Sequence, residues 1–500
     1  MPASPSLHDV IIVGAGLAGI GTAYRLQEKC PQKRFVILEA RAQLGGTWDL
    51  FRYPGVRSDS DMFTFGYRFR PWQNPQALSS GADIMTYLRD TAREYGIDER
   101  IRYRHRVTAA DWSGETATWT LTVDRGGEKI TLRTRFLYLC TGYYSYDEAH
   151  RPEFTGEADF TGRIVHPQFW PEDLDYTDRR VVVVGSGATA VTLVPALAAR
   201  AAHVTMLQRS PTHIMTLPNR NALYVRLRRL LPDRYAYRLT RWANLGVSML
   251  LYGLSRWFPD RVAKMIRRGV AGQVGPDVDV DTHFRPRYDP WDQRLCLVPD
   301  GDLFRVLREK NASVVTDAID RFIPNGLRLA SGRELPTDLV VLATGLKIKL
   351  LGGAALTVDG RPVRTSDIVM YKGMLPGGVP NLAVAFGYTN ASWTLKTDLT
   401  ANYVCKLLNY MDRHDYVTVV PRPEADPDTR PFLDFSAGYV ERAADVMPKQ
   451  GTRRPWRVYQ NYAMDALQTR FGRINDGVLA FGRRGAGKKS YRADDQFTND

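Results

Sequence analysis

Short apolar runs alternate with helical stretches along much of this chain, and several of the runs end in glycine. Val10–Val13 and Phe35–Leu38 lie on either side of a predicted helix over about Ala18–Lys29. Arg180–Val184 and His203–Leu207 lie on either side of a second predicted helix. Apolar runs of this length, joined through helices, are typical of buried parallel strands. The pattern therefore predicts an α/β fold with two Rossmann-like units.

A glycine-rich turn joins the first of these strands to its helix. Its glycines have the spacing that lets a strand turn tightly into a helix, whose N-terminal amides can then bind a pyrophosphate. Glu39 ends the next strand, about 20 residues later, where a carboxylate can bind ribose hydroxyls and would repel a 2′-phosphate. The residues of the turn are Gly14, Gly16, Ala18 and Gly19. This unit therefore predicts FAD or NAD.

The second unit opens in the same way, but its second strand ends differently. Arg209 and Ser210 follow that strand, and no acid stands there. An arginine can bind a 2′-phosphate through two parallel N–H groups, and a serine hydroxyl can add a further bond. The second unit is therefore predicted to bind NADPH, and the first unit is predicted to bind FAD. Ala190 replaces the third glycine of the turn, which the pattern allows. The residues expected to bind NADPH are Gly185, Ser186, Gly187, Ala188, Thr189, Ala190, Arg209 and Ser210.

Two longer motifs resemble the fingerprints of a known family. The first contains Gly45, Gly46, Trp48, Tyr53, Pro54, Gly55 and Asp59, and the second contains Phe160, Gly162, His166, Trp170 and Pro171. Both are similar to signatures of the type I Baeyer–Villiger monooxygenases, which are class B flavoprotein monooxygenases, and every fixed position is filled. The stretches that most resemble the mycobacterial, ethionamide-activating branch of that family are Gly45–Trp72, Trp170–Ser210, Pro290–Arg305 and Tyr388–Asp398.

The resemblance implies roles for residues on the FAD side. FAD would lie around Thr47–Leu50, with its adenine near Val107 and its isoalloxazine ring near Asp59. Thr344-Gly345 would mark the return of the chain to the FAD domain. The residues that the resemblance adds to the FAD site are Gly46, Thr47, Trp48, Asp49, Leu50, Arg57, Ser58, Asp59, Val107, Thr344 and Gly345.

Arg294 matches the active-site arginine of this family. It stands in an apolar, aromatic stretch, where an arginine is costly to bury without an anion. From the residues alone, a structural ion pair with an acid stays open as an alternative. The resemblance makes Arg294 a catalytic residue and Asp59 the residue that orients it. Gln293 replaces a lysine that many relatives carry, so a relaxed preference for NADPH over NADH is expected.

The resemblance also implies the reaction. NADPH would reduce FAD, O2 would add to give a C4a-peroxyflavin, and one oxygen atom would be inserted next to a ketone carbonyl to give an ester or lactone. Sulfides or thioamides would be oxygenated at sulfur. The alternative is an N- or S-hydroxylating flavin monooxygenase, which needs no active-site arginine. A dithiol reductase would need a Cys-x-x-Cys pair, which is absent, and a non-catalytic flavin-binding module is a third alternative.

The chain is expected to leave the FAD domain and to return to it. The predicted parts are an FAD domain in residues 1–145 and 346–500, an NADPH domain in 146–211 and 292–345, and a helical insertion in 212–291. In the family, an insertion at this point caps the substrate side. Phe160–Pro171 is expected to be a hinge whose geometry His166 fixes. The tail from Arg483, rich in glycine and lysine, is expected to be mobile.

Positive charge is concentrated in one segment of the chain, and it bears on the possible partners of the enzyme. The chain carries a net charge of +14, and residues 216–272 hold twelve lysines and arginines against two acids, a net charge of +10. A solvated helical face explains such a charge, and peripheral membrane contact is the sharper alternative. No nucleic-acid-binding motif accompanies the charge, so no nucleic-acid partner is expected.

The cysteines indicate the compartment. Cys30, Cys140, Cys296 and Cys405 lie far apart, so neither a metal site nor a dithiol centre is expected. Free thiols fit a reducing cytosol. The first nine residues have neither the basic start nor the apolar core of a signal peptide, and the longest apolar run, Leu245–Leu254, is too short to span a bilayer. A cytoplasmic enzyme with a small-molecule ketone or sulfide substrate is therefore expected.

Overall fold

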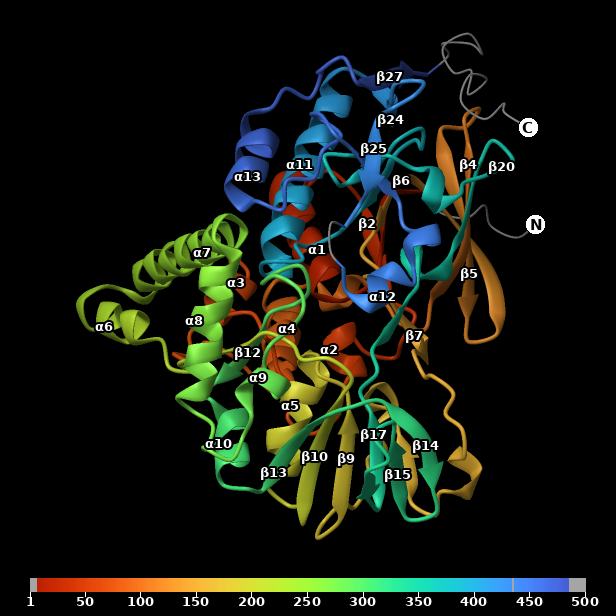
Figure 1. The fold of residues 1–500 in the computed structure, drawn as a ribbon. Helices are drawn as coiled ribbons and strands as arrows, with labels where there is room; N and C mark the ends of the chain where they lie inside the picture. Colours follow the sequence, from red (N-terminus) through yellow and green to blue (C-terminus); the bar gives the residue numbers. More distant parts are fainter. Residues whose placement is uncertain (1–6, 434–435, 485–500) are drawn as a thin grey trace.

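The computed structural model describes residues 7–433 and 436–484 (Figure 1). Two sheets form the body of the molecule, a larger one in the upper half of the view and a smaller one in the lower half. The predicted mobile tail lies outside the described residues beyond residue 484, whereas Arg483 itself ends a strand, β27 (Leu479–Arg483).

The larger sheet has nine strands and begins with the apolar run predicted first. Val10, Ile11 and Ile12 are fully buried in its central strand β1, as expected for a strand covered on both faces. Strands β1, β2, β3, β6 and β23 are parallel, and β4, β5 and β6 form an antiparallel meander. The nine strands are β1 (Leu7–Val13), β2 (Phe35–Leu38), β3 (Ile101–Arg102), β4 (Arg106–Ser113), β5 (Thr118–Arg125), β6 (Glu128–Leu139), β19 (Ala355–Val358), β20 (Arg361–Pro362) and β23 (Leu382–Val384).

Helices from both ends of the chain cover this sheet. The predicted first helix is α1 (Leu17–Lys29), and α11 (Trp393–Arg413) packs against it. Strand β23 ends at Val384, and the chain then leads to the start of α11 at Trp393. The other helices of this part are α2 (Thr47–Leu50), α3 (Met62–Phe65), α4 (Gly81–Glu94), α12 (Gly438–Glu441) and α13 (Tyr462–Phe471), and small two-stranded pairs are β21 (Met370–Tyr371) with β22 (Leu375–Pro376), β24 (Tyr416–Pro421) with β27, and β25 (Thr429–Pro431) with β26 (Lys449–Gly451).

The smaller sheet is entirely parallel, with the strand order β13-β10-β9-β17-β8. Its strands are β8 (Arg163–Val165), β9 (Arg180–Val184), β10 (His203–Gln208), β13 (Ala312–Thr316) and β17 (Leu339–Leu342). Helices α5 (Ala188–Leu197) and α10 (Asp302–Arg308) belong to this unit, and a three-stranded antiparallel sheet consists of β14 (Ile319–Ile323), β15 (Gly326–Leu329) and β16 (Glu334–Pro336). The predicted α/β fold with two Rossmann-like units is confirmed.

Two neighbouring segments connect the sheets. Strand β7 (Tyr144–Ala149) follows the larger sheet, and strand β18 (Leu346–Ile348) follows the smaller one. They pair with each other in antiparallel fashion. Within residues 7–433 and 436–484, the chain therefore crosses from one sheet to the other, and returns, where these two strands pair.

A group of helices interrupts the second unit, as the sequence predicts, and projects from the body at the left of Figure 1. It lies between β11 (Ile214–Leu217) and β12 (Cys296–Pro299), which pair in parallel. Among the described residues, no helix is long and apolar enough to cross a bilayer. The helices are α6 (Ala222–Leu230), α7 (Asp233–Trp257), α8 (Pro259–Ala271) and α9 (Val280–His283). The boundaries of the predicted domains stay predictions.

A buried arginine anchors this group of helices to the FAD side. Arg241 of α7 donates from Nη1 to the main-chain oxygens of Phe63 (2.7 Å), Thr64 (3.1 Å) and Gly66 (2.8 Å) at the end of α3. The last carbonyls of a helix have no partner within the helix, and a cation is favoured there. One guanidinium therefore satisfies the end of α3 and ties the insertion to it.

Replacing Arg241 with methionine should lower the free energy of unfolding by about 3 kcal/mol, because three buried carbonyls would lose a charged donor. Urea unfolding followed by far-UV circular dichroism measures the change. Arg238→Met, an exposed position one turn earlier in α7, is the matched control and should change the free energy by less than about 0.5 kcal/mol. Equal effects of the two substitutions would show that the buried contacts contribute nothing.

Candidate active site

A cavity of about 980 Å³ lies where the two sheets face each other. Four parallel strands, β1, β6, β9 and β17, end at its wall with the segments Val13-Gly14, Cys140–Gly142, Val184-Gly185 and Ala343–Gly345. In open α/β sheets, ligands bind outside the carboxyl ends of the strands. Because both sheets present these ends to one cavity, two nucleotide cofactors could meet there.

The first glycine of each turn is required by the chain itself. Gly14 has a φ of +105°, and a Cβ there would lie 2.5 Å from the oxygen of Cys140. Gly185 has a φ of +142°, and a Cβ there would lie 2.4 Å from the oxygen of Ala343. In both units the glycine lets the turn after one strand pass close to the end of a neighbouring strand.

The second glycine of each turn has no such internal reason. Gly16 and Gly187 have φ values of −80° and −78°, which any residue can adopt. A Cβ at Gly16 would meet nothing nearer than 3.5 Å, and a Cβ at Gly187 nothing within 4 Å. Both line the cavity at the first turn of a helix. Bare glycines at these places leave room for a pyrophosphate to reach the helix amides, so the turns fit two dinucleotides.

Glu39 lies at the cavity with both carboxylate oxygens engaged. They accept hydrogen bonds from the backbone N–H groups of Ala15 (2.8 Å) and Arg41 (2.9 Å). Burial raises the pKa of Glu39, and these two bonds oppose the rise. Each oxygen has a second lone pair that can accept a ribose hydroxyl, so the predicted role fits the geometry.

Two arginines that form no ion pair in the described part of the chain also line the cavity. Arg209 follows β10, as predicted, and Arg442 follows α12, more than two hundred residues later in the chain. Burial lowers the pKa of Arg442, the charge of the neighbouring Glu441 opposes this, and the like charge of Arg209 lowers the pKa further. Within the described residues, neither forms an ion pair with a carboxylate. Two neighbouring cations that form no ion pair attract an anionic group such as a phosphate.

Arg294 and Asp59 form a bidentate ion pair on the cavity wall. The distances are 2.7 Å from Nε to Oδ2 and 2.7 Å from Nη2 to Oδ1. Nη2 also donates to the hydroxyl of Ser60 (3.3 Å), and Nη1 donates to the main-chain oxygen of Thr389 (2.8 Å). The structure therefore brings together the two residues predicted to be catalytic.

The surroundings of Arg294 keep it charged while leaving it able to act. Burial lowers the pKa of Arg294, but the charge and hydrogen bonds of Asp59 raise it by more, so that the pKa lies above its ordinary value. A guanidinium has five N–H donors, and four of them are used by Asp59, Ser60 and Thr389. Within the described chain one N–H of Nη1 has no partner, and it can bind an oxygen atom in the cavity.

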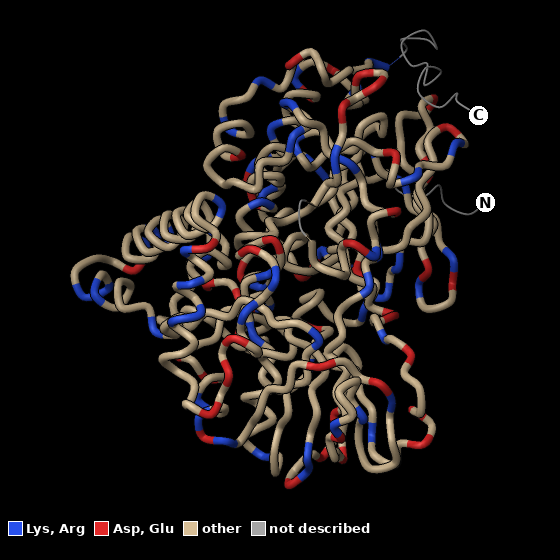
Figure 2. Tube along the Cα trace, in the orientation of Figure 1, with Lys and Arg blue, Asp and Glu red and all other residues tan. Residues whose placement is uncertain are grey.

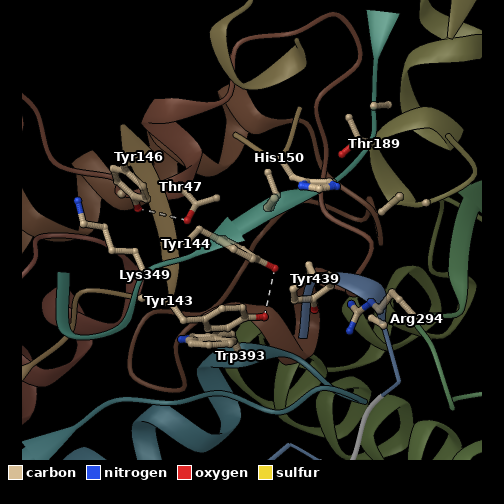
Figure 3. Close-up of a pocket in the computed structure, with 18 of the residues that line it drawn as sticks. Thr47, Tyr143, Tyr144, Tyr146, His150, Thr189, Arg294, Lys349, Trp393 and Tyr439 are labelled. Atoms are coloured by element: carbon tan, nitrogen blue, oxygen red, sulfur yellow. Dashed lines mark hydrogen bonds between the residues drawn. The ribbon is translucent and has the colours of Figure 1, made fainter. Parts of the chain in front are cut away.

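An aromatic cluster that the sequence motifs did not reveal lies beside Arg294 (Figure 3). The hydroxyls of Tyr143 and Tyr144 are 3.1 Å apart, and the ring of Tyr143 lies 5.2 Å from that of Trp393. Tyr439 lies between Tyr144 and Arg294 in the view. Burial raises the pKa values of all three tyrosines well above 10, so their hydroxyls stay protonated. The sequence could have indicated two members of this cluster, because Tyr143 and Tyr144 directly follow Thr141-Gly142 at the end of a predicted strand.

Most of the predicted site residues reach the cavity. Those that line it are Gly14, Gly16, Ala18, Glu39, Gly46, Thr47, Trp48, Ser58, Asp59, Val107, Gly185, Ser186, Gly187, Ala188, Thr189, Arg209, Ser210, Arg294, Thr344 and Gly345.

Five predicted residues lie behind the cavity wall. Asp49 is buried and bonded to Arg41 at 2.7 Å, and Arg57 forms an ion pair with Asp302. A Cβ on Gly19 would lie 1.9 Å from the oxygen of Gly14, so this glycine serves the packing of α1 on its own turn. The other two are Leu50 and Ala190. For these five, direct contact with a cofactor stays a prediction.

His166 fixes the segment that connects the two sheets. Its Nδ1 accepts a hydrogen bond from the backbone N–H of Gln168 (3.1 Å). The amide of Gln168, which is buried, donates to the main-chain oxygen of Ser145 (2.9 Å) in the crossing strand β7. Phe160–Pro171 is thus bonded to the place where the chain changes sheets, which fits the expected hinge.

Comparisons with known proteins decide the family. The family model described as pyridine nucleotide-disulphide oxidoreductase matches residues 11–221. Over 480 residues, the chain is 52% identical to the FAD-containing monooxygenase EthA of Mycobacterium tuberculosis, covering 96% of this chain and 98% of the relative. The chain belongs to the family of FAD-containing monooxygenases.

Solved structures share the fold of this monooxygenase at low sequence identity. The complex of OTEMO with FAD and NADP matches with a TM-score of 0.74 at 20% identity, covering 96% of this chain and all (100%) of that one. The polycyclic ketone monooxygenase from the fungus Thermothelomyces thermophila matches with a TM-score of 0.77 at 18% identity, covering 97% and 91%. At such identities the likeness shows the fold.

Membership confirms the predicted enzyme class. The chain is a flavoprotein monooxygenase with FAD as its cofactor, and such an enzyme uses O2 and a small-molecule substrate. The match with EthA agrees with the branch that the motifs indicated. FAD and NADP, the pair of cofactors predicted from the two turns, occur together in the OTEMO complex. The roles of individual residues stay predictions.

The histidine of the connecting segment predicts a pH dependence of stability. Burial lowers the pKa of His166 to about 4, whereas an unfolded histidine has a pKa near 6.5. The folded state therefore favours the neutral ring, and the stability that this ring contributes is present above about pH 6.5 and is lost as the pH falls towards 4. The loss should approach 1.4 kcal/mol per pH unit at most.

Urea unfolding of the parent and of His166→Asn, at pH 7.5 and at pH 5, measures this loss. The asparagine oxygen can replace Nδ1 as an acceptor but does not titrate. The parent should lose more stability than the variant between the two pH values. Parallel losses in both proteins would assign the pH dependence to other groups.

Proposed function

We propose that this monooxygenase is a Baeyer–Villiger enzyme, which inserts one oxygen atom of O2 next to the carbonyl of a ketone to give an ester or lactone. The observation that supports this most is the ion pair of Arg294 and Asp59 on the cavity wall. It supplies a fixed cation with a free N–H at the point where both sheets end. In the same proposal, sulfides or thioamides are oxygenated at sulfur.

The two glycine turns suggest which residues hold each cofactor. FAD would be held by the start of α1, by Glu39 at its ribose and by Thr47 and Trp48, with Val107 near its adenine. NADPH would be held by the start of α5, and Arg209 and Ser210 would receive its 2′-phosphate. When bound, these cofactors supply the electrons and the activation of O2. The fit rests on the two glycines that leave room at the helix starts.

Arg294 would act on the charge that develops during attack on the carbonyl. A fixed guanidinium beside an oxygen atom that gains negative charge lowers the barrier, and one such preorganised contact is typically worth about 3 kcal/mol. Asp59 binds one edge of the guanidinium, through Nε and Nη2, and so orients the remaining N–H. Asp59 is therefore a positioning residue in this proposal, because it acts through Arg294.

The aromatic cluster indicates the character of the substrate. Tyr143, Tyr144, Tyr439 and Trp393 form an apolar wall with neutral hydroxyls beside Arg294. Such a wall favours a lipophilic ketone or sulfide whose one polar group lies at the guanidinium. A charged substrate would find no buried partner among these aromatic side chains.

The closest alternative is N- or S-hydroxylation without ketone chemistry. Oxygenation of an amine or a sulfide develops no anion on a carbonyl and has no need of a fixed cation. The pairing of Arg294 with Asp59 therefore favours the ketone reaction.

A cytoplasmic location is part of the proposal, because all four cysteines are free and buried, which suits a reducing compartment.

Arg294→Ala should lower kcat for ester formation from a ketone by about a hundredfold, which is the usual cost of removing one such donor. Product analysis by gas chromatography, with a cyclic ketone and an aryl sulfide as substrates, measures both reactions. Sulfoxide formation should fall much less. Arg294→Lys keeps the charge without the fork and should lie between the parent and the alanine variant.

Arg267→Ala, which removes another ion-paired arginine (2.8 Å to Asp281) away from the cavity, is the matched control and should behave like the parent. Ester formation by Arg294→Ala at the parental rate would refute the role of this arginine. Equal loss of ester and sulfoxide would assign it to general folding of the site.

Arg209→Ala should raise the KM for NADPH by about tenfold to a hundredfold, the cost of losing one charged contact. The KM for NADH should change little, since NADH lacks the 2′-phosphate. Initial rates of cofactor oxidation measure both constants. Arg200→Ala, which removes another arginine of the same unit that bonds Thr177 and does not line the cavity, is the control. Equal changes for the two cofactors would place the 2′-phosphate elsewhere.

A further inference from the structure

Helix α7 carries a stripe of exposed apolar side chains along its outer face. The stripe consists of Tyr235, Leu239, Trp242, Leu250 and Trp257, and it is continued between them by Gly246 and Gly253. These positions are spaced by three or four residues, so they lie on one side of the helix. Trp242 is 57% exposed, Leu250 60% and Trp257 74%.

The opposite face of α7 is the one that packs on the protein. Tyr237 and Leu245 are buried there, together with the anchoring Arg241. A helix of a globular protein normally presents a single apolar face and turns it inward. Here the outer face is apolar as well. Phe258 and Met265, which follow α7 in the chain, are also about half exposed. An exposed apolar surface of this kind marks an interaction site.

Lysines and arginines also lie in α6, α7 and α8, which pack on one another, and Figure 2 marks their positions along the backbone in blue. Arg238 stands next to Leu239 in α7, Arg226 and Arg229 lie in α6, and Arg261 and Lys264 lie in α8. Within the described residues, none of these five forms an ion pair with a carboxylate, although Arg228 and Arg267 nearby do. The surface therefore combines exposed tryptophans with cations that have no acidic partner inside the protein.

We propose that the outer face of α6, α7 and α8 docks on the surface of an anionic phospholipid bilayer. An apolar stripe with tryptophan enters the boundary between headgroups and acyl chains, and lysines and arginines around it bind the anionic headgroups. A second copy of this chain fits the same face poorly, because a twofold contact would bring the same positive charge against itself.

Docking would bring the cavity close to the bilayer. The inner face of α7 packs through Leu245 against Tyr388 and Leu395, and Tyr388 lines the cavity. Trp242 of the stripe also contacts Tyr462 of α13, with ring centroids 6.2 Å apart. One layer of side chains thus separates the docking helix from the cavity. This geometry stands whichever reaction takes place there.

Sedimentation with lipid vesicles tests the proposal on the full-length, FAD-loaded enzyme. Vesicles of phosphatidylcholine alone are compared with vesicles of equal parts phosphatidylcholine and phosphatidylglycerol. The parent should sediment with the mixed vesicles and stay in solution with the neutral ones, and high salt should weaken the binding. Quenching of tryptophan fluorescence by brominated lipid should be seen in the parent and should be reduced in Trp257→Gln.

Two sets of variants separate the charged and apolar contributions. Arg229→Gln/Arg261→Gln/Lys264→Gln should lower the partition coefficient by on the order of a hundredfold, because each headgroup-facing cation contributes about fivefold. Trp242→Gln/Trp257→Gln should lower it by about tenfold or more. The flavin absorption spectrum should match that of the parent in both sets, since all five side chains are exposed at the surface. Thermal unfolding should also match in the charge variant, whereas Trp242→Gln loses the ring contact with Tyr462.

The matched control removes the same charge elsewhere. Arg321→Gln/Arg328→Gln/Arg333→Gln lies on strands β14 and β15 and the turn after them, at the far end of the smaller sheet, and should bind the mixed vesicles like the parent. Equal losses in the control and in the α6–α8 triple variant would reduce the effect to net charge and overturn the proposal.

Absence of binding to both vesicle types would also overturn the proposal. So would self-association of the parent without lipid, if light scattering shows it and Trp242→Gln/Trp257→Gln abolishes it, because the stripe would then join two copies of the chain.

Discussion

The bidentate bond between Arg294 and Asp59 is the contact on which the site depends. It joins residues 235 positions apart, so it forms only when three parts of the chain have been assembled. Asp59 lies in the loop before α3, Arg294 follows the helical insertion, and Thr389, which accepts a further bond from Arg294, precedes α11. The chain leaves the larger sheet, forms the smaller sheet and then returns. This order brings the three parts together.

The same backbone device creates the cavity twice. In each sheet a glycine in the left-handed region lets the turn after one strand pass beside the end of another, at Gly14 with Cys140 and at Gly185 with Ala343. Because both turns face one space, a cofactor at one helix start would meet a cofactor at the other. The paired crossing strands β7 and β18 join the two halves, and Gln168 bonds to β7.

Strands and turns were predictable because their signals are local. Apolar runs such as Phe35–Leu38 became strands with the predicted bounds, since burial on both faces requires unbroken apolar sequence. Side-chain direction was less predictable. Asp49 and Arg57 stand in the same stretch as Thr47, Trp48, Ser58 and Asp59, which line the cavity. Yet they turn to Arg41 and Asp302. A linear motif carries no information about which neighbour satisfies a buried charge.

Contacts between distant segments could not be predicted from the sequence for the same reason. Helix α7 is an example. The sequence predicted a helical insertion in this part of the chain, and its charge suggested a solvated or membrane-facing surface. Only the structure separates its arginines into two kinds. Arg241 is buried and donates hydrogen bonds to carbonyls at the end of α3, next to the loop that carries Asp59. Arg238 is exposed beside the apolar stripe. The inner face of α7 thus supports the wall of the active site, and its outer face is amphipathic and exposed. The sequence of this one helix must satisfy both requirements.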